Sequence, residues 1–419
     1  MLTAGSRGDV QPYAALGVGL KQAGHQVTLA THELFREFVS DLGLEFKPLA
    51  GDPQELLSSE RGQEWVQSGQ NSLAFLANFI KLTRPYFRQQ LQDCQRAAEG
   101  ADLLLFSPFT GGGMDVAEKM GIPVALTAVQ PFHATRAFPA MGAFGTFGVP
   151  FLNYGSHRTT EYLMWLPFRD IYNRWRQEDL GLPPRGLKGP MTRMQQYEIP
   201  TLYGYSPSLI PRPEDWAPWI HVTGYWYLDQ VDDWQPPARL RSFLEAGDPP
   251  VYLGFGSMIH HDGDSILKMA RHVADALGCR MILQRGWQKL AAEEESERIL
   301  VIDSTPHSWL FPKMAAVVHH GGAGTTAAGL RAGVPSLLVP HFADQFFWAD
   351  WVARREAGPP AIPRKELSAG RLIRAIERAL EDQRLRAHAA ALGASIRSEH
   401  GVHRAADLVE SIGRQDPPW

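Results

Sequence analysis

Cysteine is the scarcest reactive residue in this chain of 419 residues, where only Cys94 and Cys279 occur. Two cysteines so far apart make neither a disulfide framework nor a metal site, and they fit a reducing cytoplasm. An excess of charge of one sign is also lacking, because 41 basic and 45 acidic residues leave a net charge of −4. This balance argues against a general nucleic-acid binder.

Long apolar runs are absent as well. No stretch approaches the ~18 apolar residues that cross a bilayer, and no secretory signal precedes the first expected strand. The opening residues 1–4 look like the end of a strand, as if a few residues were missing upstream. The sequence therefore predicts a chain without a membrane span.

Short apolar runs alternate with helical patterns along both halves of the chain. This alternation is typical of βαβ units that build a parallel sheet. The expected strands are residues 1–4, 25–30, 102–107 and 123–129, then 251–255, 280–284, 299–302, 315–319 and 335–339.

The length favours two domains, since about 200 residues per domain is usual. We predict an N-terminal domain at 1–228 and a C-terminal domain at 239–419, whose last helix is free to pack back on the first domain. Residues 229–238 between them are polar and contain two prolines, which is typical of a linker.

An aromatic segment from residue 132 to about 199 interrupts the alternation. It forms either an apolar ligand pocket or a helical subdomain that packs the aromatic side chains as its own core. Candidate ligand contacts are Phe132, His133, Phe144 and Trp165. A lone loop histidine such as His133 is more often neither a ligand contact nor a titrating group.

The first glycine-rich turn spans residues 2–10. Glycine at the carboxyl end of a strand lets a ligand approach the backbone at the edge where open α/β sheets bind ligands. Gly5 and Gly8 do not form the GxGxxG pattern, and Glu33 falls beyond the end of the second strand, so a nicotinamide-dependent oxidoreductase is disfavoured. Asp9 after the turn is either a helix N-cap or a general base, with the helix expected from about Pro12.

The second glycine-rich turn follows the apolar run at residues 317–319. His320, Gly322, Gly324 and Thr325 precede a helical pattern, and the amides at a helix N-terminus bind phosphate. No lysine follows the glycines, so this is not the loop of a nucleotide hydrolase. The alternative is a tight strand-to-helix connection, which three glycines, two threonines and a histidine make the weaker interpretation.

A carboxylate and an amide, Asp344 and Gln345, follow the next expected strand. The carboxyl ends of parallel strands share one sheet edge, so this pair should face the same region as the phosphate turn. Together the two groups are suited to binding vicinal hydroxyls of a sugar.

The residues at these turns resemble a known family. Residues 5–12 (GSRGDVQP) and 319–333 (HHGGAGTTAAGLRAG) are similar to nucleotide-sugar glycosyltransferases of the GT-B fold, which include sterol 3-β-glucosyltransferases and bacterial enzymes that glycosylate antibiotics. The motifs that resemble the sterol branch most are residues 135–139, 173–176, 219–226, 306–312 and 344–349.

The resemblance implies two Rossmann-like, doubly wound α/β domains facing a central cleft, with the acceptor held mainly by the first and the nucleotide sugar by the second. It implies Asp9 as the catalytic base and an inverting, metal-independent transfer of glucose from UDP-glucose, without a cofactor. The implied donor-binding residues are Ser257, Ser304, His307, His320, Gly322, Gly324, Thr325, Asp344 and Gln345.

The identity of the acceptor stays open at this stage. The 3-hydroxyl of a sterol is favoured, and a polyketide, macrolide or other natural-product aglycone is the alternative. A further alternative for the function is a non-catalytic UDP-sugar-binding protein, and TDP-sugars remain open as donors. An apolar acceptor also leaves open a transient contact with a membrane surface, although no basic amphipathic helix stands out to anchor the chain.

Overall fold

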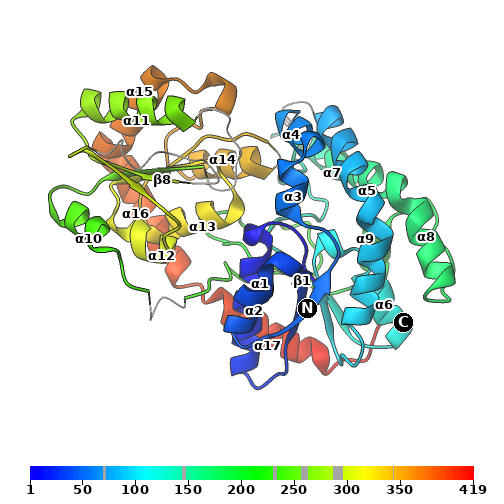
Figure 1. The fold of residues 1–419 in the computed structure, drawn as a ribbon. Helices are drawn as coiled ribbons and strands as arrows, with labels where there is room; N and C mark the ends of the chain where they lie inside the picture. The colour runs from blue at the N-terminus through cyan, green and yellow to red at the C-terminus, as the bar shows by residue number, and fades with distance from the viewer. Residues whose placement is uncertain (69–71, 144–147, 230–233, 256–262, 286–295, 343) are drawn as a thin grey trace. The chain divides into compact units, whose positions relative to one another are not determined.

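The computed structural model describes residues 1–419 except 69–71, 144–147, 230–233, 256–262, 286–295 and 343. The chain forms two compact units (Figure 1): unit 1 comprises Met1–Leu228 and Glu399–Trp419, and unit 2 comprises Asp229–Ser398. Unit 2 thus starts at the first residue of the predicted linker, and the last helix of the chain belongs to unit 1.

Unit 1 alternates strands with helices until the aromatic segment adds helices of its own. Its strands are β1 (Thr28–His32), β2 (Glu45–Leu49), β3 (Leu104–Phe106), β4 (Val124–Ala128), β5 (Thr201–Tyr203) and β6 (Ile220–Val222). Its helices are α1 (Arg7–Gln22), α2 (Arg36–Asp41), α3 (Pro53–Ser58), α4 (Glu60–Gln67), α5 (Ser72–Ala97), α6 (Gly113–Met120), α7 (Pro150–Trp165), α8 (Arg169–Glu178), α9 (Pro190–Gln196) and α17 (Gly401–Gly413).

The sheet of unit 1 is parallel throughout its named strands. β1 pairs with β2, and β3 to β6 follow one another in the order β3-β4-β5-β6. The predicted strand at residues 1–4 is only a bridge at Leu2, which pairs with both Ala30 of β1 and Phe106 of β3. Leu2 therefore joins the two groups of strands and brings the turn that follows it to the carboxyl edge of the sheet.

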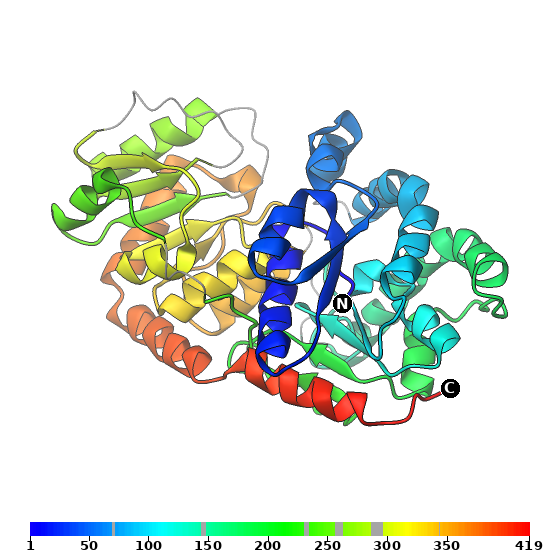
Figure 2. The same cartoon turned by 60° about the horizontal axis from the view of Figure 1, so that its bottom comes forward.

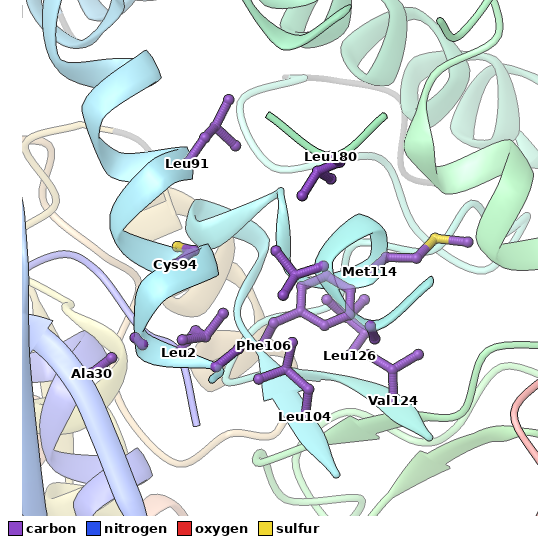
Figure 3. Packing of buried hydrophobic residues seen from close by; sticks show 14 of the residues in the cluster. Leu2, Ala30, Leu91, Cys94, Leu104, Phe106, Met114, Val124, Leu126 and Leu180 are labelled. Atoms are coloured by element: carbon purple, nitrogen blue, oxygen red, sulfur yellow. The ribbon is translucent and has the colours of Figure 1, made fainter. Parts of the chain in front are cut away.

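Apolar strand side chains of unit 1 pack against the helices on one face of the sheet. Figure 3 shows the packing of Leu2, Leu104, Phe106, Val124 and Leu126 with Met114 of α6 and with Leu91 and Cys94 of α5. Burial of each leucine or phenylalanine of this kind contributes roughly 1.5–3 kcal/mol. This core holds the strand ends that carry the candidate site.

The opposite face of the sheet is covered in part by α1 and α17. Figure 2 shows α17, in red, passing close to α1 on its way to the C-terminus. A Cβ atom at Gly19 of α1 would lie only 2.3 Å from Cγ1 of Val402, so glycine permits this close contact. The last helix is thereby fixed to unit 1.

A buried ionic cluster ties the aromatic segment to α6. Asp115 of α6 accepts hydrogen bonds from Tyr172 and Arg185 and forms an ion pair with Arg176, and Asp115 and Arg176 are fully buried. A buried charge without its partner typically costs 3–5 kcal/mol. Because the arginines come from α8 and the loop after it, the cluster fixes these segments in one position.

Unit 2 is a five-stranded parallel sheet with helices on its connections. Its strands are β7 (Val251–Gly254), β8 (Met281–Gln284), β9 (Ile299–Ile302), β10 (Ala316–His319) and β11 (Ser336–Leu338), in the order β11-β10-β7-β8-β9. Its helices are α10 (Ala238–Glu245), α11 (Gly263–Leu277), α12 (His307–Leu310), α13 (Ala323–Ala332), α14 (Asp344–Arg354), α15 (Ala369–Glu381) and α16 (Gln383–Arg397). The chain order reverses on either side of β7, which is where open α/β sheets bind ligands.

Candidate functional site

Asp9 is part of the start of α1 and is not its N-cap. The helix begins at Arg7, with Ser6 as the cap, so the predicted start at Pro12 was wrong and the proline lies inside the helix. Oδ2 of Asp9 accepts hydrogen bonds from the backbone N–H of Ser6 at 2.8 Å and from its hydroxyl at 3.0 Å. This reciprocal cap uses one carboxylate oxygen and leaves Oδ1 available.

Burial changes the acidity of this carboxyl group. It raises the pKa of Asp9 above its usual value, against the opposing effect of the hydrogen bonds from Ser6. Asp9 nevertheless keeps part of its surface exposed. A partly exposed carboxylate with a raised pKa is suited to accept a proton near neutral pH.

The turn before Asp9 is held by a histidine that the sequence did not reveal. Gly5 has φ +131°, and a Cβ there would lie 2.4 Å from Oδ2 of Asp9, so only glycine fits. The N–H of Gly5 donates to Nε2 of His32 at 2.9 Å. His32 must then be neutral, and burial lowers its pKa accordingly.

The second turn is shorter than the sequence suggested, because α13 begins at Ala323. Gly324 and Thr325 therefore belong to the first helical turn, whose amides have no partner within the helix. Apart from α13 itself, the described residues place no atom within 4 Å of the point where a Cβ of Gly324 would sit, so they leave this side open. Thr325 is half-buried, whereas Thr326 is fully buried, so Thr325 has the hydroxyl that a ligand can reach.

His320 and Gly322 lie together at this helix start. A Cβ at Gly322 would lie 2.5 Å from Nε2 of His320, so glycine lets the ring pass across the N-terminus of α13. The neighbouring Gly321 has φ +93°, and its N–H donates to Nδ1 of the buried His319 at 3.1 Å. Burial lowers the pKa of His319 well below its usual value, so this histidine also acts as a neutral acceptor.

Asp344 and Gln345 open α14, next to the second turn. A Cβ at Gly321 would lie 3.2 Å from the carbonyl oxygen of Gln345, which shows how closely the two loops approach. Asp344 is half-buried and accepts from Nε1 of Trp348 at 3.0 Å. The side chain of Gln345 is buried, and its Oε1 accepts from the N–H of His341 at 2.8 Å, so this oxygen holds the loop.

The predicted base-binding residues lie after β9. Ser304 is exposed, and His307 starts α12 with its ring stacked on Phe311 at 4.3 Å between centroids. Nε2 of His307 lies 3.2 Å from Oε1 of Gln284, at the end of β8. Ser304, His307 and Gln284 share the carboxyl edge of the unit 2 sheet with the two loops described above. Ser257 lies outside the described residues.

Two aromatic side chains lie at the corresponding edge of unit 1. Phe132, after β4, is half-buried and meets Phe109, after β3, edge to face with ring centroids 6.4 Å apart. Phe109 was missed by the sequence analysis and is 40% exposed, so it is open to a ligand. Trp165, by contrast, is buried against Tyr172 and belongs to the core of the aromatic segment, while Phe144 lies outside the described residues.

His133 has a structural role, because it is too buried for an acceptor to contact. It is only 1% exposed, and its Nδ1 lies 2.7 Å from the hydroxyl of Tyr203. The Tyr203 oxygen already accepts from the N–H groups of Phe132 and His133, so its single proton is donated to Nδ1. His133 is thus a neutral acceptor that fixes the loop after β4.

This arrangement predicts a loss of stability in acid. Burial lowers the pKa of His133 to about 3, while the unfolded chain binds the proton near the ordinary value of 6.5. The contribution of His133 to the free energy of unfolding is therefore complete above pH 6.5 and declines as the pH falls toward 3. Between pH 7 and pH 5 it should weaken by about 2 kcal/mol.

Urea unfolding of the wild type and of His133→Gln at both pH values tests this prediction. Glutamine keeps an acceptor for Tyr203 but does not titrate. We expect the wild type to lose about 2 kcal/mol more than the variant over this range. Equal losses would show that folding does not lower the pKa of His133.

The described residues do not bring together three or more His, Cys, Asp or Glu side chains in a way that could hold a metal ion. Among the helices that the structure describes, none combines the length and apolar character needed to span a bilayer.

Two family models match the chain at its two halves. Residues 1–139 match the glycosyltransferase family 28 N-terminal domain. Residues 281–407 match the C-terminal domain of erythromycin biosynthesis protein CIII-like proteins. The first match contains Asp9 and the second contains the loops at His320 and Asp344.

Similar curated proteins align along almost the whole chain. A sterol 3-beta-glucosyltransferase of Debaryomyces hansenii is 38% identical, covering 98% of this chain and 26% of the relative. The sterol 3-beta-glucosyltransferase of Yarrowia lipolytica is also 38% identical, covering 96% of this chain and 28% of the relative. The chain thus spans about a quarter of the length of the curated relatives it matches.

Solved structures resemble the chain at lower sequence identity. The glycotransferase of kitacinnamycin has a TM-score of 0.72 at 22% identity and covers 98% of each chain. The calicheamicin glycosyltransferase CalG4 has a TM-score of 0.70 at 18% identity, covering 98% of this chain and 97% of that one. These structures show that the chain has the GT-B fold, and the two family models place glycosyltransferase domains at residues 1–139 and 281–407 of it.

Proposed function

We propose that this chain transfers glucose from UDP-glucose to a hydroxyl of a bulky apolar acceptor, the 3-hydroxyl of a sterol, with inversion at the anomeric carbon. The observation that carries the proposal is the alignment of sterol 3-beta-glucosyltransferases over 96–98% of the chain at 38% identity. Asp9, the α13 loop and Asp344 supply chemistry of the kind that this reaction needs.

The start of α13 is the proposed holder of the diphosphate. Amides of the first turn and the helix dipole favour negative charge there, and Thr325 and His320 add donors beside them. These groups stabilise the diphosphate as its bond to the sugar breaks. We therefore propose that the leaving group needs neither a metal ion nor a cofactor, and that Asp344 contacts the sugar hydroxyls.

Asp9 is the proposed general base. Its Oδ1 takes the proton of the acceptor hydroxyl, and the oxygen attacks the anomeric carbon as the bond to the β-phosphate of UDP breaks. Attack from the face opposite the leaving group converts an α-linked donor into a β-glycoside. The proton ends on Asp9, and UDP leaves with the bonding electron pair, so the step is balanced. Phe109 and Phe132 are the proposed apolar contacts of the acceptor.

His32 gives a test of how the base is positioned. His32→Leu removes the acceptor of the Gly5 N–H, whereas His32→Gln retains one, so the leucine variant should lose about tenfold in kcat. We expect His32→Gln to recover most of this loss and both variants to bind UDP as the wild type does. Steady-state kinetics and UDP titration measure these values. Equal kcat values for the two variants would remove the positioning role.

Titration of the chain with UDP, TDP and NAD tests the class of donor. We expect saturable binding of UDP that is tighter than that of TDP, and no binding of NAD. Binding of NAD would restore the oxidoreductase alternative. Binding of a UDP-sugar without hydrolysis or transfer would indicate a non-catalytic binding protein. The free thiols of Cys94 and Cys279 favour a reducing cytoplasm as the place of the reaction.

A further inference from the structure

Exposed apolar side chains gather in one part of unit 1. Of eleven large hydrophobic residues that are exposed in the described part of the chain, eight lie between Val149 and Leu187. Phe151, at the start of α7, is 78% exposed, the highest value among these eleven residues. Scattered exposure needs no explanation, whereas a cluster of this kind marks an interaction surface.

Most of the cluster lies on α7. With 3.6 residues per turn, most of the exposed positions fall within an arc of about 120°, and the exposed Tyr154 and Thr160 lie outside it. Its apolar members, which we call the α7 stripe, are Phe151, Leu152, Tyr162 and Leu163 of α7 and Leu166, which directly follows this helix. Gly155 and Thr159 complete the arc, which contains no charged residue, and Arg158 lies directly at its border.

The opposite side of α7 faces the protein and contains buried polar residues as well as the buried Trp165. The buried Asn153 donates to the carbonyl of Arg136 at 3.1 Å, and Nε2 of the buried His157 lies 3.0 Å from the carbonyl of Phe138. Glu161 lies on the same side as these two residues and pairs at 2.6 Å with Arg158, which lies at the border of the stripe. A surface helix in water normally has the reverse polarity. The contacts with residues 136–138 fix α7 in this orientation and present its apolar side outward.

The size of the stripe limits what can cover it. From Phe151 to Leu166 the helix rises about 22 Å, and a stripe about 10 Å wide then presents roughly 200 Å². A stable protein partner, including a second copy of this chain, needs about 800 Å² on each side. A fluid apolar surface has no such minimum, because it adapts to a convex helix and each buried side chain adds to binding.

We propose that α7 docks on the surface of a lipid bilayer, with the α7 stripe inserted at the boundary between headgroups and acyl chains. The choice of a bilayer as the occupant rests on the proposed function, since a sterol acceptor is itself dissolved in lipid. Docking by unit 1, which contains Asp9 and Phe109, brings the acceptor-binding half of the chain to the phase that contains the acceptor. No lipid charge is needed, because the stripe has none.

Sedimentation with vesicles tests this docking without any use of catalysis. The wild type should bind vesicles of phosphatidylcholine with 20 mol% sterol, and binding should change less than about twofold between 50 mM and 500 mM salt, because screening acts only on charges. Phe151→Ser combined with Leu163→Ser should weaken binding about tenfold or more. Leu34→Ser is the matched control, since Leu34 is 42% exposed but lies outside the stripe, and it should bind as the wild type does.

Three results would overturn the docking surface. These are no vesicle binding by the wild type, equal binding by the double variant, or a dimer in solution that the double variant dissociates. Since both positions are exposed, the thermal unfolding of the variants should match the wild type. Transfer to a sterol delivered in cyclodextrin should also be unchanged. A chain that binds vesicles through the stripe but transfers no glucose would contradict the proposed function alone.

Discussion

Asp9→Asn should retain the affinity of the chain for UDP while glucosyl transfer falls about 10²- to 10⁴-fold, the range that a general base contributes. The amide oxygen of asparagine can still accept the hydrogen bonds from Ser6 that cap α1, so the fold of the turn should survive. What is lost is the second carboxylate oxygen as a proton acceptor. Single-turnover transfer and UDP titration on the same preparation measure the two quantities.

The pH profile of the wild type adds a second measure of Asp9. Because burial raises the pKa of this carboxyl, kcat/KM should decline at a pH above that expected for an ordinary aspartate as the solution is acidified. Transfer by Asp9→Asn at nearly the wild-type rate would mean that Asp9 only caps the helix, and the proposed mechanism would be wrong.

Gly324→Val combined with Thr325→Ala should weaken UDP binding about 10- to 100-fold, the loss expected from one or two charge-assisted hydrogen bonds. The valine side chain would occupy the open space beside the first turn of α13, and the alanine removes the reachable hydroxyl. Calorimetric titration with UDP measures the effect, and uridine, which has no phosphate, should lose much less.

Gly370→Val is the matched control for this loop. Gly370 is the second residue of α15 and also follows an alanine, as Gly324 does in α13. A change of helix propensity is therefore common to both variants. UDP affinity should be unchanged in Gly370→Val, and equal losses in the two variants would remove the phosphate role from α13.

The alternation of apolar runs was enough to predict most of the sheet. All nine expected strands lie on a strand or, at residues 1–4, on the bridge at Leu2. The strands that were missed are β2, which is polar, and β5 and β6, which have three residues each. Short strands of this kind are recognised by their neighbours in the sheet and have too few positions for a periodic signal.

The glycine-rich turns were visible in the sequence because glycine positions have a local cause. His32 and His319 were not, because each acts through a single hydrogen bond to a glycine with positive φ. His32 lies 27 residues from the glycine that it holds, a distance that no spacing rule connects. The two units thus hold their glycine turns in the same way, with a neutral buried histidine.

The aromatic segment shows the limit of composition most clearly. Density of aromatic residues could not distinguish pocket from core, and the structure assigns Trp165 to the core and leaves Phe132 at the sheet edge. Periodicity also could not show that α7 turns Asn153 and His157 inward. The pattern of a helix alone does not give the direction in which each of its sides faces. The contacts of Asn153 and His157 supply that direction.

The measurement that tests the central claim most directly is product analysis of one reaction. The chain is incubated with UDP-glucose and a panel of sterols and polyketide aglycones, and the products are identified by mass spectrometry and by the anomeric coupling in NMR. We predict a sterol carrying one hexose in β linkage at its 3-hydroxyl, together with stoichiometric UDP. Glucosylation of the polyketides alone, an α linkage, or UDP released without a glycoside would contradict the account.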